Sequence, residues 1–161
     1  MREILRYYLE IRDLKDLKKV NAPNKDVAFQ LVTKPDFNLN KFFYKQIGKN
    51  HRWTDRLSWN DQIWSNYITN NLVKTYILKE GEELAGYFEQ IHNKDNNEHE
   101  IAYFGILEEY RNKRYGAYLL SKAIELSLID DSKRVWVHTC TLDHKNAIKN
   151  YLSRGMKIFK E

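Results

Sequence analysis

An apolar run at residues 100–107 leads directly into a basic turn and then into a helix-like segment at 115–128. This succession constrains the fold more than any other part of the chain. The run is the most apolar strand-like segment of the sequence, which places it at the centre of a sheet. A further strand-like segment follows at 134–140, and two strands separated by one helix predict a parallel crossover.

The other segments predict a mixed sheet. Strand-like patterns occur at 3–12, 27–33, 73–79, 84–92 and 156–160, and helix-like patterns at 14–20, 38–47, 58–70 and 145–154. Asn38 and Ser58 are the expected N-caps of the second and third helices. The turn Glu80-Gly81-Glu82 predicts an antiparallel hairpin. We therefore expect one α/β domain over residues 1–161, with a mixed, mostly antiparallel central sheet flanked by helices.

Composition restricts the partners that the chain is expected to bind. The net charge of +5 comes from 27 basic and 22 acidic residues, and the charges are interspersed rather than gathered in a stripe. That distribution does not favour nucleic acid. One cysteine, Cys140, is too few for an internal disulfide or a cysteine zinc site. Without an apolar leader or a run long enough to span a membrane, we expect a cytoplasmic protein with no membrane partner and no metal.

The turn at 110–120 has the chemistry of an anion site. The first N–H groups of a helix lack partners within the helix, and the helix dipole adds positive charge there. Gly116 and Ala117 leave room for a phosphate beside the backbone, and Arg111, Lys113 and Arg114 add charge. The alternative is an ordinary strand-to-helix turn with a solvated basic face.

This turn resembles motif A of the GNAT N-acetyltransferase superfamily, Arg/Gln-x-x-Gly-x-Gly/Ala. Here it is written Arg111-x-x-Arg114-x-Gly116, followed by Ala117, with Arg114 in place of the first glycine. The phrase from His51 to Leu57 is similar to one in a group of small bacterial GNAT proteins.

Residues 141–156 resemble motif B of the same superfamily, Asn-x-x-Ala-x-x-x-Tyr-x-x-x-Gly-Phe. Ala147, Tyr151 and Gly155 fall at the required spacings, while His144 replaces the asparagine and Met156 the phenylalanine. The two motifs lie in the family's order, separated by one helix and one strand.

The resemblance implies a GNAT-like acyl-CoA N-acyltransferase fold and transfer of an acetyl group from acetyl-CoA to a primary amine of a small molecule or protein by direct attack. The alternative is a non-catalytic acyl-CoA-binding sensor or regulatory module. The implied cofactor contacts are Ile106, Leu107, Arg111, Asn112, Lys113, Arg114, Tyr115, Gly116, Ala117, His144, Ala147 and Tyr151. Backbone N–H groups near Ile106 and Leu107 are expected to meet the oxyanion.

Tyr151 is the candidate general acid, because an ordinary tyrosine pKa of about 10 exceeds a thiol's pKa of about 8.5. The alternative is a core tyrosine. Glu100 is the candidate general base, on the strand face expected to include Phe104 and Ile106, or else a solvated glutamate at a strand end. Glu89 and His138 are secondary candidates.

The loop 51–56 is the candidate wall of the acceptor site. Trp53 offers a flat surface, Asp55 could pair with an ammonium group, and Arg56 could hold a carboxylate. The alternative is that Trp53 packs helices onto the sheet while Asp55 and Arg56 pair with each other. The sequence ends after one short strand where GNAT sheets usually have one more, so either the sheet ends early or a partner chain covers the exposed edge, and we expect a homodimer.

Overall fold

The computed structural model describes residues 4–129, 131–143 and 146–161. Its strands are β1 (Arg6–Ile11), β2 (Val27–Leu31), β3 (Val73–Glu80), β4 (Glu83–Asn93), β5 (Glu98–Ile106), β6 (Arg134–Cys140) and β7 (Lys157–Lys160). Its helices are α1 (Phe37–Gly48), α2 (Asp61–Ile68), α3 (Tyr115–Ile129) and α4 (Ala147–Ser153), with 3₁₀ turns η1 (Leu14–Asp16) and η2 (Glu108–Tyr110).

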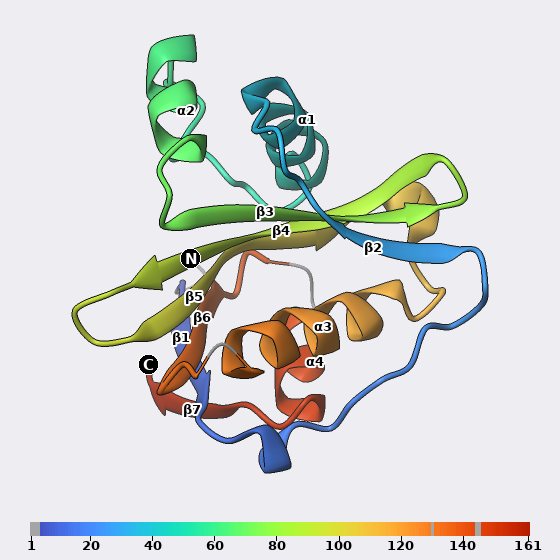
Figure 1. Cartoon of the computed structure of the whole chain (residues 1–161), viewed down its shortest axis with the longest axis vertical. Helices are drawn as coiled ribbons and strands as arrows, with labels where there is room; N and C mark the ends of the chain where they lie inside the picture. The colour runs from blue at the N-terminus through green and yellow to red at the C-terminus, as the bar shows by residue number, and fades with distance from the viewer. Residues whose placement is uncertain (1–3, 130, 144–145) are drawn as a thin grey trace.

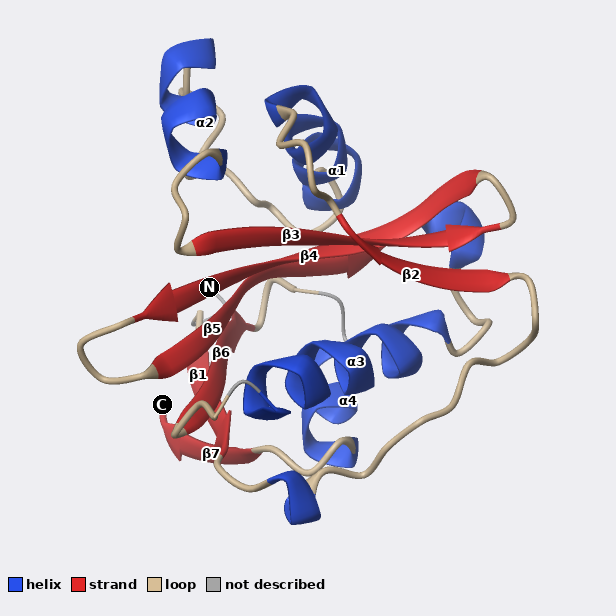
Figure 2. Ribbon diagram, viewed as in Figure 1, coloured by secondary structure: helices blue, strands red, loops and turns tan. Residues whose placement is uncertain are grey.

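The strands form a seven-stranded sheet in the order β2-β3-β4-β5-β6-β1-β7. Only the β5–β6 pair is parallel, and the other neighbouring pairs are antiparallel. β5 is the central strand, as its apolar sequence predicted. Helices α1 and α2 lie on one face of the sheet, and α3 and α4 lie on the other (Figures 1 and 2). This architecture confirms the predicted mixed α/β fold.

β1 occupies a place that the sequence did not indicate. It pairs with β6 on one side and with β7 on the other, antiparallel to both. β6 and β7 therefore run in the same direction without being neighbours, so only the crossover through α3 joins adjacent parallel strands. β7 forms one edge of the sheet, and the homodimer expected at such an edge stays a prediction.

Two helices begin where a carboxylate or amide side chain can accept a backbone hydrogen bond. The Asp36 carboxylate accepts from the Asn38 N–H, and the Asn60 side chain accepts from the Ile63 N–H. Both capping residues have the extended backbone that an N-cap requires. The predicted caps, Asn38 and Ser58, were therefore wrong by two residues each. The helix expected at 14–20 is only the turn Leu14–Asp16.

α3 anchors the layer that carries the turn at 110–120. Leu119, Leu120, Ala123 and Ile124 are fully buried in the core. Such burial contributes about 25 cal/mol per Å² of apolar surface removed from water. The first turn of α3 is thereby held rigidly beside the sheet. Within the described residues, no helix combines the length and the apolar character that crossing a membrane requires.

Candidate functional site

The central feature of the site is a cleft where β5 and β6 separate. Their parallel pairing joins residues 98–100 to residues 134–136 and does not continue along the described remainder of either strand. β5 stays paired with β4 and β6 with β1, so the two halves of the sheet diverge. A cleft of about 1200 Å³ opens there, lined by residues 101–106, 137–140, the start of α3, α4 and the loop after α1.

A bulge in β5 determines which of its side chains lie on each face of the sheet. Glu89 pairs with Tyr103 and Gln90 with Ile101, so Ala102 is an additional residue in β5. The bulge reverses the alternation of side chains along the strand. Glu100 therefore shares a face with Tyr103, on the side of α1 and α2. The expectation that Glu100 shares a face with Phe104 and Ile106 was wrong for this reason.

The backbone of β5 presents donors to the cleft. The Leu107 N–H donates to the Ala85 carbonyl at 2.8 Å. Because residues alternate along an antiparallel ladder, the N–H groups of Ile106 and Phe104 point the other way, toward β6 and the cleft. Leu107 is buried and lies outside the cleft lining, so its N–H cannot meet an oxyanion as expected. Phe104 was not among the donors expected from the sequence, because its place in the ladder depends on the bulged pairing of β5 with β4.

The turn before α3 brings most of its predicted residues to the cleft. Arg111, Asn112, Arg114, Tyr115, Gly116 and Ala117 all line it. Lys113 does not, because its Nζ lies 3.3 Å from the Glu80 carboxylate on β3. A methyl group added at Gly116 would meet its nearest neighbours only at 3.7 and 3.8 Å. The fold itself therefore does not require glycine there, and the backbone of Gly116 lies in the lining of the cleft.

The turn has an unusual backbone. Asn112 and Arg114 both have φ of 66°, in the left-handed region. Arg114 stands where the family has its first glycine, a residue that adopts this conformation without steric cost. Arg114 thus adopts, at a cost in backbone strain, a conformation that glycine would adopt freely.

One face of α4 closes the cleft opposite β5. Ala147, Asn150, Tyr151 and Arg154 follow the spacing of neighbouring helical turns, and all four line the cleft. The Asn150 amide donates to the Gly116 carbonyl at 3.2 Å, which joins α4 to the first turn of α3. The predicted contact His144 lies outside the described residues. Asn150 and Arg154 were missed, although their spacing from Ala147 and Tyr151 indicated them.

Tyr151 is buried but reaches the cleft. Its ring centroid lies 6.5 Å from that of Phe104. Burial, and secondarily the charge of Asp143, raises the pKa of the Tyr151 hydroxyl above its ordinary value of 10. The hydroxyl therefore keeps its proton throughout the neutral range.

The loop after α1 forms the opposite wall. Trp53 and Asp55 line the cleft. The Trp53 Nε1 donates to Asp143, and Asp55 accepts from the Tyr44 hydroxyl at 3.0 Å and the Tyr103 hydroxyl at 2.5 Å. Burial acts to raise the pKa of Asp55, but these tyrosine hydrogen bonds outweigh it and lower the pKa. Asp55 is therefore a fixed negative charge beside Trp53.

Arg56 is not a cleft residue. Its side chain is 5% exposed, and its Nη1 lies 3.0 Å from the fully buried carboxylate of Glu89. Rings of Tyr103 and Tyr67 pack 4.1 and 4.3 Å from the guanidinium. The expectation that Arg56 binds substrate was wrong, because Glu89 and the aromatic rings enclose it. The alternative Asp55–Arg56 pair is not formed either, and enclosed Glu89 cannot reach a substrate as a base.

Glu100 and His138 lie together at the cleft. His138 lines it, and its Nε2 lies 3.8 Å from the Glu100 carboxylate, which stands behind the lining. The His138 side chain is 40% exposed, and its partial burial, followed by the charge of Arg6, lowers its pKa. Burial raises the pKa of Glu100. Neutral imidazole is thus available inside the cleft at neutral pH. No cluster of three or more potential metal ligands occurs in the described parts of the chain.

Residues 37–156 match the sequence profile of the acetyltransferase (GNAT) family. No curated protein matches the chain. Among solved structures, a GCN5-related N-acetyltransferase from Sphaerobacter thermophilus is similar with a TM-score of 0.72 at 12% identity, covering 96% of this chain and 48% of that protein. The chain thus spans about half the length of that relative.

Two further structures are similar over most of both chains. An aminoglycoside acetyltransferase from an uncultured soil metagenomic sample, in complex with trehalose, has a TM-score of 0.66 at 9% identity, with 80% of this chain and 87% of that one covered. A Bacillus subtilis acetyltransferase in complex with CoA has a TM-score of 0.63 at 18% identity, with coverage of 83% and 78%. At these identities the likeness concerns the fold.

Proposed function

The chain belongs to the acetyltransferase (GNAT) family, and from this premise we propose that it transfers an acetyl group from acetyl-CoA to a primary amine of a small molecule or protein. The family and the fold together support an acyl-CoA-dependent N-acetyltransferase. The observation that carries the proposal is the cleft between β5 and β6, bordered by backbone donors, a helix N-terminus and a protonated tyrosine.

Three parts of acetyl-CoA, which supplies the activated thioester, suit groups that line the cleft. The backbone of Gly116 and Ala117 at the start of α3, which lines the cleft together with Arg111, suits the pyrophosphate. The gap between the separated strands suits the extended pantetheine arm. The N–H groups of Ile106 and Phe104 suit the thioester carbonyl, where they would stabilise the negative charge that develops on its oxygen.

Tyr151 is proposed to give its proton to the departing thiolate. Its raised pKa keeps it protonated before the reaction, and its place on α4 faces the end of β5 where the carbonyl would lie. The protonated hydroxyl donates a hydrogen bond to the sulfur, and shares its proton with the negative charge that develops there as the carbon–sulfur bond breaks.

Proton removal from the amine is proposed to use Glu100 through His138. The imidazole lines the cleft and the carboxylate stands 3.8 Å behind it. An attacking amine must lose a proton as it bonds to the carbonyl carbon. A neutral His138 takes that proton, and Glu100 stabilises the resulting imidazolium.

The acceptor amine is proposed to enter between Trp53 and Asp55. The indole gives a flat apolar surface, and the charged Asp55 attracts an ammonium group before it is deprotonated. Trp53 and Asp55 together select for a cationic amine and place no further requirement on the acceptor molecule.

Two measurements test the proposal. In the first, the protein is incubated with acetyl-CoA and each of a panel of primary amines, and the release of free thiol is measured. In the second, heat denaturation of the protein is recorded with and without acetyl-CoA. Transfer to at least one amine, together with stabilisation by the cofactor, supports the proposal. Stabilisation without release for every amine would instead favour the acyl-CoA-binding sensor.

A further inference from the structure

Arg154 has buried donors that the protein does not satisfy. It caps the C-terminal end of α4, and its side chain lines the cleft. Within the described residues, its Nε and Nη1 are buried and have no hydrogen-bond partner. A buried guanidinium donor without an acceptor is costly, and native proteins rarely leave one so. The position therefore indicates a ligand that supplies the acceptors.

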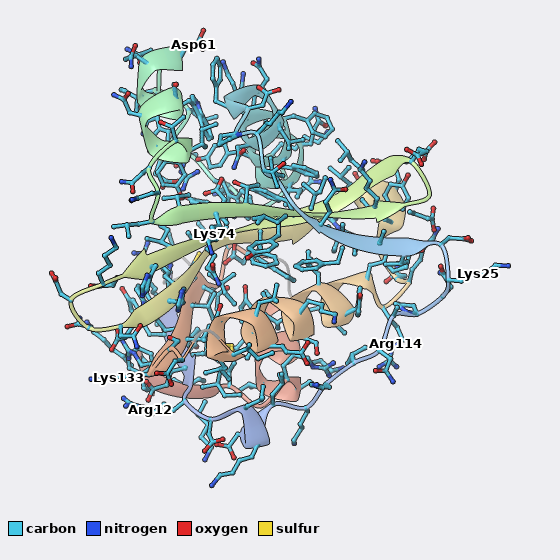
Figure 3. All side chains as sticks on the ribbon, in the orientation of Figure 1. Arg12, Lys25, Asp61, Lys74, Arg114 and Lys133 are labelled. Atoms are coloured by element: carbon cyan, nitrogen blue, oxygen red, sulfur yellow. The ribbon has the colours of Figure 1, made fainter. Side chains whose placement is uncertain are left out.

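A second arginine lies close to the first. Burial and then the charge of Arg114 lower the pKa of Arg154, so the two positive groups repel each other. Arg114 also lines the cleft, and Figure 3 shows it at the N-terminal end of α3. The acidic side chains in the described lining, Asp55 and Asp143, belong to the wall around Trp53 instead.

We infer that Arg154 and Arg114 form a binding site for a phosphate monoester, which in acetyl-CoA is the phosphate on the 3′ carbon of the ribose. The inference rests on the proposed use of acetyl-CoA. A phosphate monoester carries about two negative charges at neutral pH, because its second pKa is about 6. Those charges match two guanidinium groups for which no ion pair with a carboxylate is found among residues 4–129, 131–143 and 146–161.

The geometry of a guanidinium favours the same ligand. Its parallel N–H groups bind two oxygens of one phosphate at once, which a lysine cannot do. Each phosphorus of the pyrophosphate carries only one charge and has the backbone of Gly116 and Ala117 as its partner. The pair of arginines is therefore a second anion site, separate from the pyrophosphate site, and it binds the doubly charged 3′-phosphate of the cofactor.

Calorimetric titration with CoA and with dephospho-CoA, which lacks only the 3′-phosphate, tests this at constant ionic strength. The wild-type protein should bind CoA about tenfold more tightly than dephospho-CoA, since hydrogen bonds to charged groups are strong. Arg154→Gln should lose most of that preference by weakening CoA binding, with dephospho-CoA affinity unchanged. Arg154→Lys keeps the positive charge but loses the two parallel N–H donors of the guanidinium, so it should retain part of the preference for CoA over dephospho-CoA.

Arg12→Gln is the matched control, because Arg12 is an exposed arginine outside the cleft; it should bind both ligands as the wild type does. The inference is overturned if the wild type binds the two ligands equally, or if Arg154→Gln weakens both alike. Should Arg154→Gln not fold, the wild-type comparison decides alone. Failure of the proposed use of acetyl-CoA looks different, since neither ligand would then bind the wild type, whereas failure of transfer alone appears only in the amine panel.

Discussion

The indole Nε1 of Trp53 donates a hydrogen bond to Asp143 Oδ1 at 3.2 Å, across 90 residues of sequence. Asp143 also accepts from the Thr139 hydroxyl at 2.5 Å, so it fixes the segment after β6 as well as the loop after α1. The two walls of the cleft are thus joined through one carboxylate.

Trp53→Phe removes this hydrogen bond and keeps an aromatic surface. One hydrogen bond is worth about 1 kcal/mol net, so we expect KM for the acceptor amine to rise about fivefold. Affinity for CoA should stay near the wild-type value, because the cofactor site is built by other elements. Steady-state kinetics with varied amine measures this, and Trp136→Phe, outside the cleft lining, is the control. An unchanged KM would show that the indole N–H does not shape the acceptor site.

The sequence predicted the parts of this site that depend on local spacing. The turn at 110–120 and the residues Ala147 and Tyr151 follow from short motifs within single segments, and the structure brings them to one cleft. The apolar run that marked β5 as central also needed only local composition. In such segments the pattern and the fold depend on the same few neighbouring residues.

The parts that the sequence did not predict depend on contacts between distant segments. The bulge at Ala102 reverses the faces of β5 and is set by pairing with β4, so Glu100 was assigned to the wrong face. Arg56 was assigned to the acceptor wall because its partner Glu89 lies 33 residues away. The residues adjacent in sequence to Glu100 and Arg56 therefore indicate neither the bulge nor the ion pair.

Tyr151→Phe should lower kcat by a factor on the order of 10², the range that a general acid contributes. The ring is kept, so packing against Phe104 and affinity for CoA should change little. Kinetics at saturating acetyl-CoA and direct titration of CoA separate the two quantities. Tyr7→Phe, on β1 and outside the cleft lining, is the control. Unchanged turnover in Tyr151→Phe would exclude the acid role.

Arg114→Gly should stabilise the fold while weakening cofactor binding. A left-handed residue costs about 1–2 kcal/mol, which glycine avoids, although glycine loses about 0.5–1 kcal/mol of that through its greater freedom when unfolded. Chemical denaturation should thus show a net gain of roughly 0.5–1 kcal/mol in the free energy of unfolding. CoA affinity should fall because a guanidinium is lost.

Asn112→Gly is the matched control, since Asn112 has the same φ of 66° but asparagine tolerates this conformation better. Its gain in stability should be smaller. A destabilised Arg114→Gly protein would contradict the strain argument, because it would mean that the side chain stabilises the turn in the absence of ligand.

Glu89→Gln should be strongly destabilising. It leaves Arg56 charged and buried without its carboxylate, and breaking one side of a buried ion pair costs about 3–5 kcal/mol. Lys19→Gln removes an exposed lysine from its pair with the partly buried Glu125 and should cost less than about 1 kcal/mol. Denaturant unfolding measures both. Equal small effects would mean that the aromatic rings around Arg56, rather than Glu89, hold this guanidinium.

The pH dependence of transfer should report His138. Burial and the charge of Arg6 lower its pKa below 6.5, while Asp55 and Asp143 act in the opposite direction. If neutral His138 takes the proton, kcat/KM rises as pH increases through a value below 6.5 and then levels off near neutrality. His138→Gln should lower kcat/KM and abolish this acidic limb. Glu100→Gln removes the carboxylate 3.8 Å away and should shift the limb to lower pH.

The lowered pKa of His138 also affects the stability of the fold, and this effect can be measured independently of activity. His138 binds a proton less readily in the folded state, so below pH 6.5 the unfolded state binds more protons and the fold loses stability as pH falls. His138→Gln should therefore unfold less steeply in acid than the wild type, even while its activity is lower. A kinetic limb that persists in His138→Gln would assign the proton to another group, whereas unchanged acid unfolding would show that burial does not lower the His138 pKa.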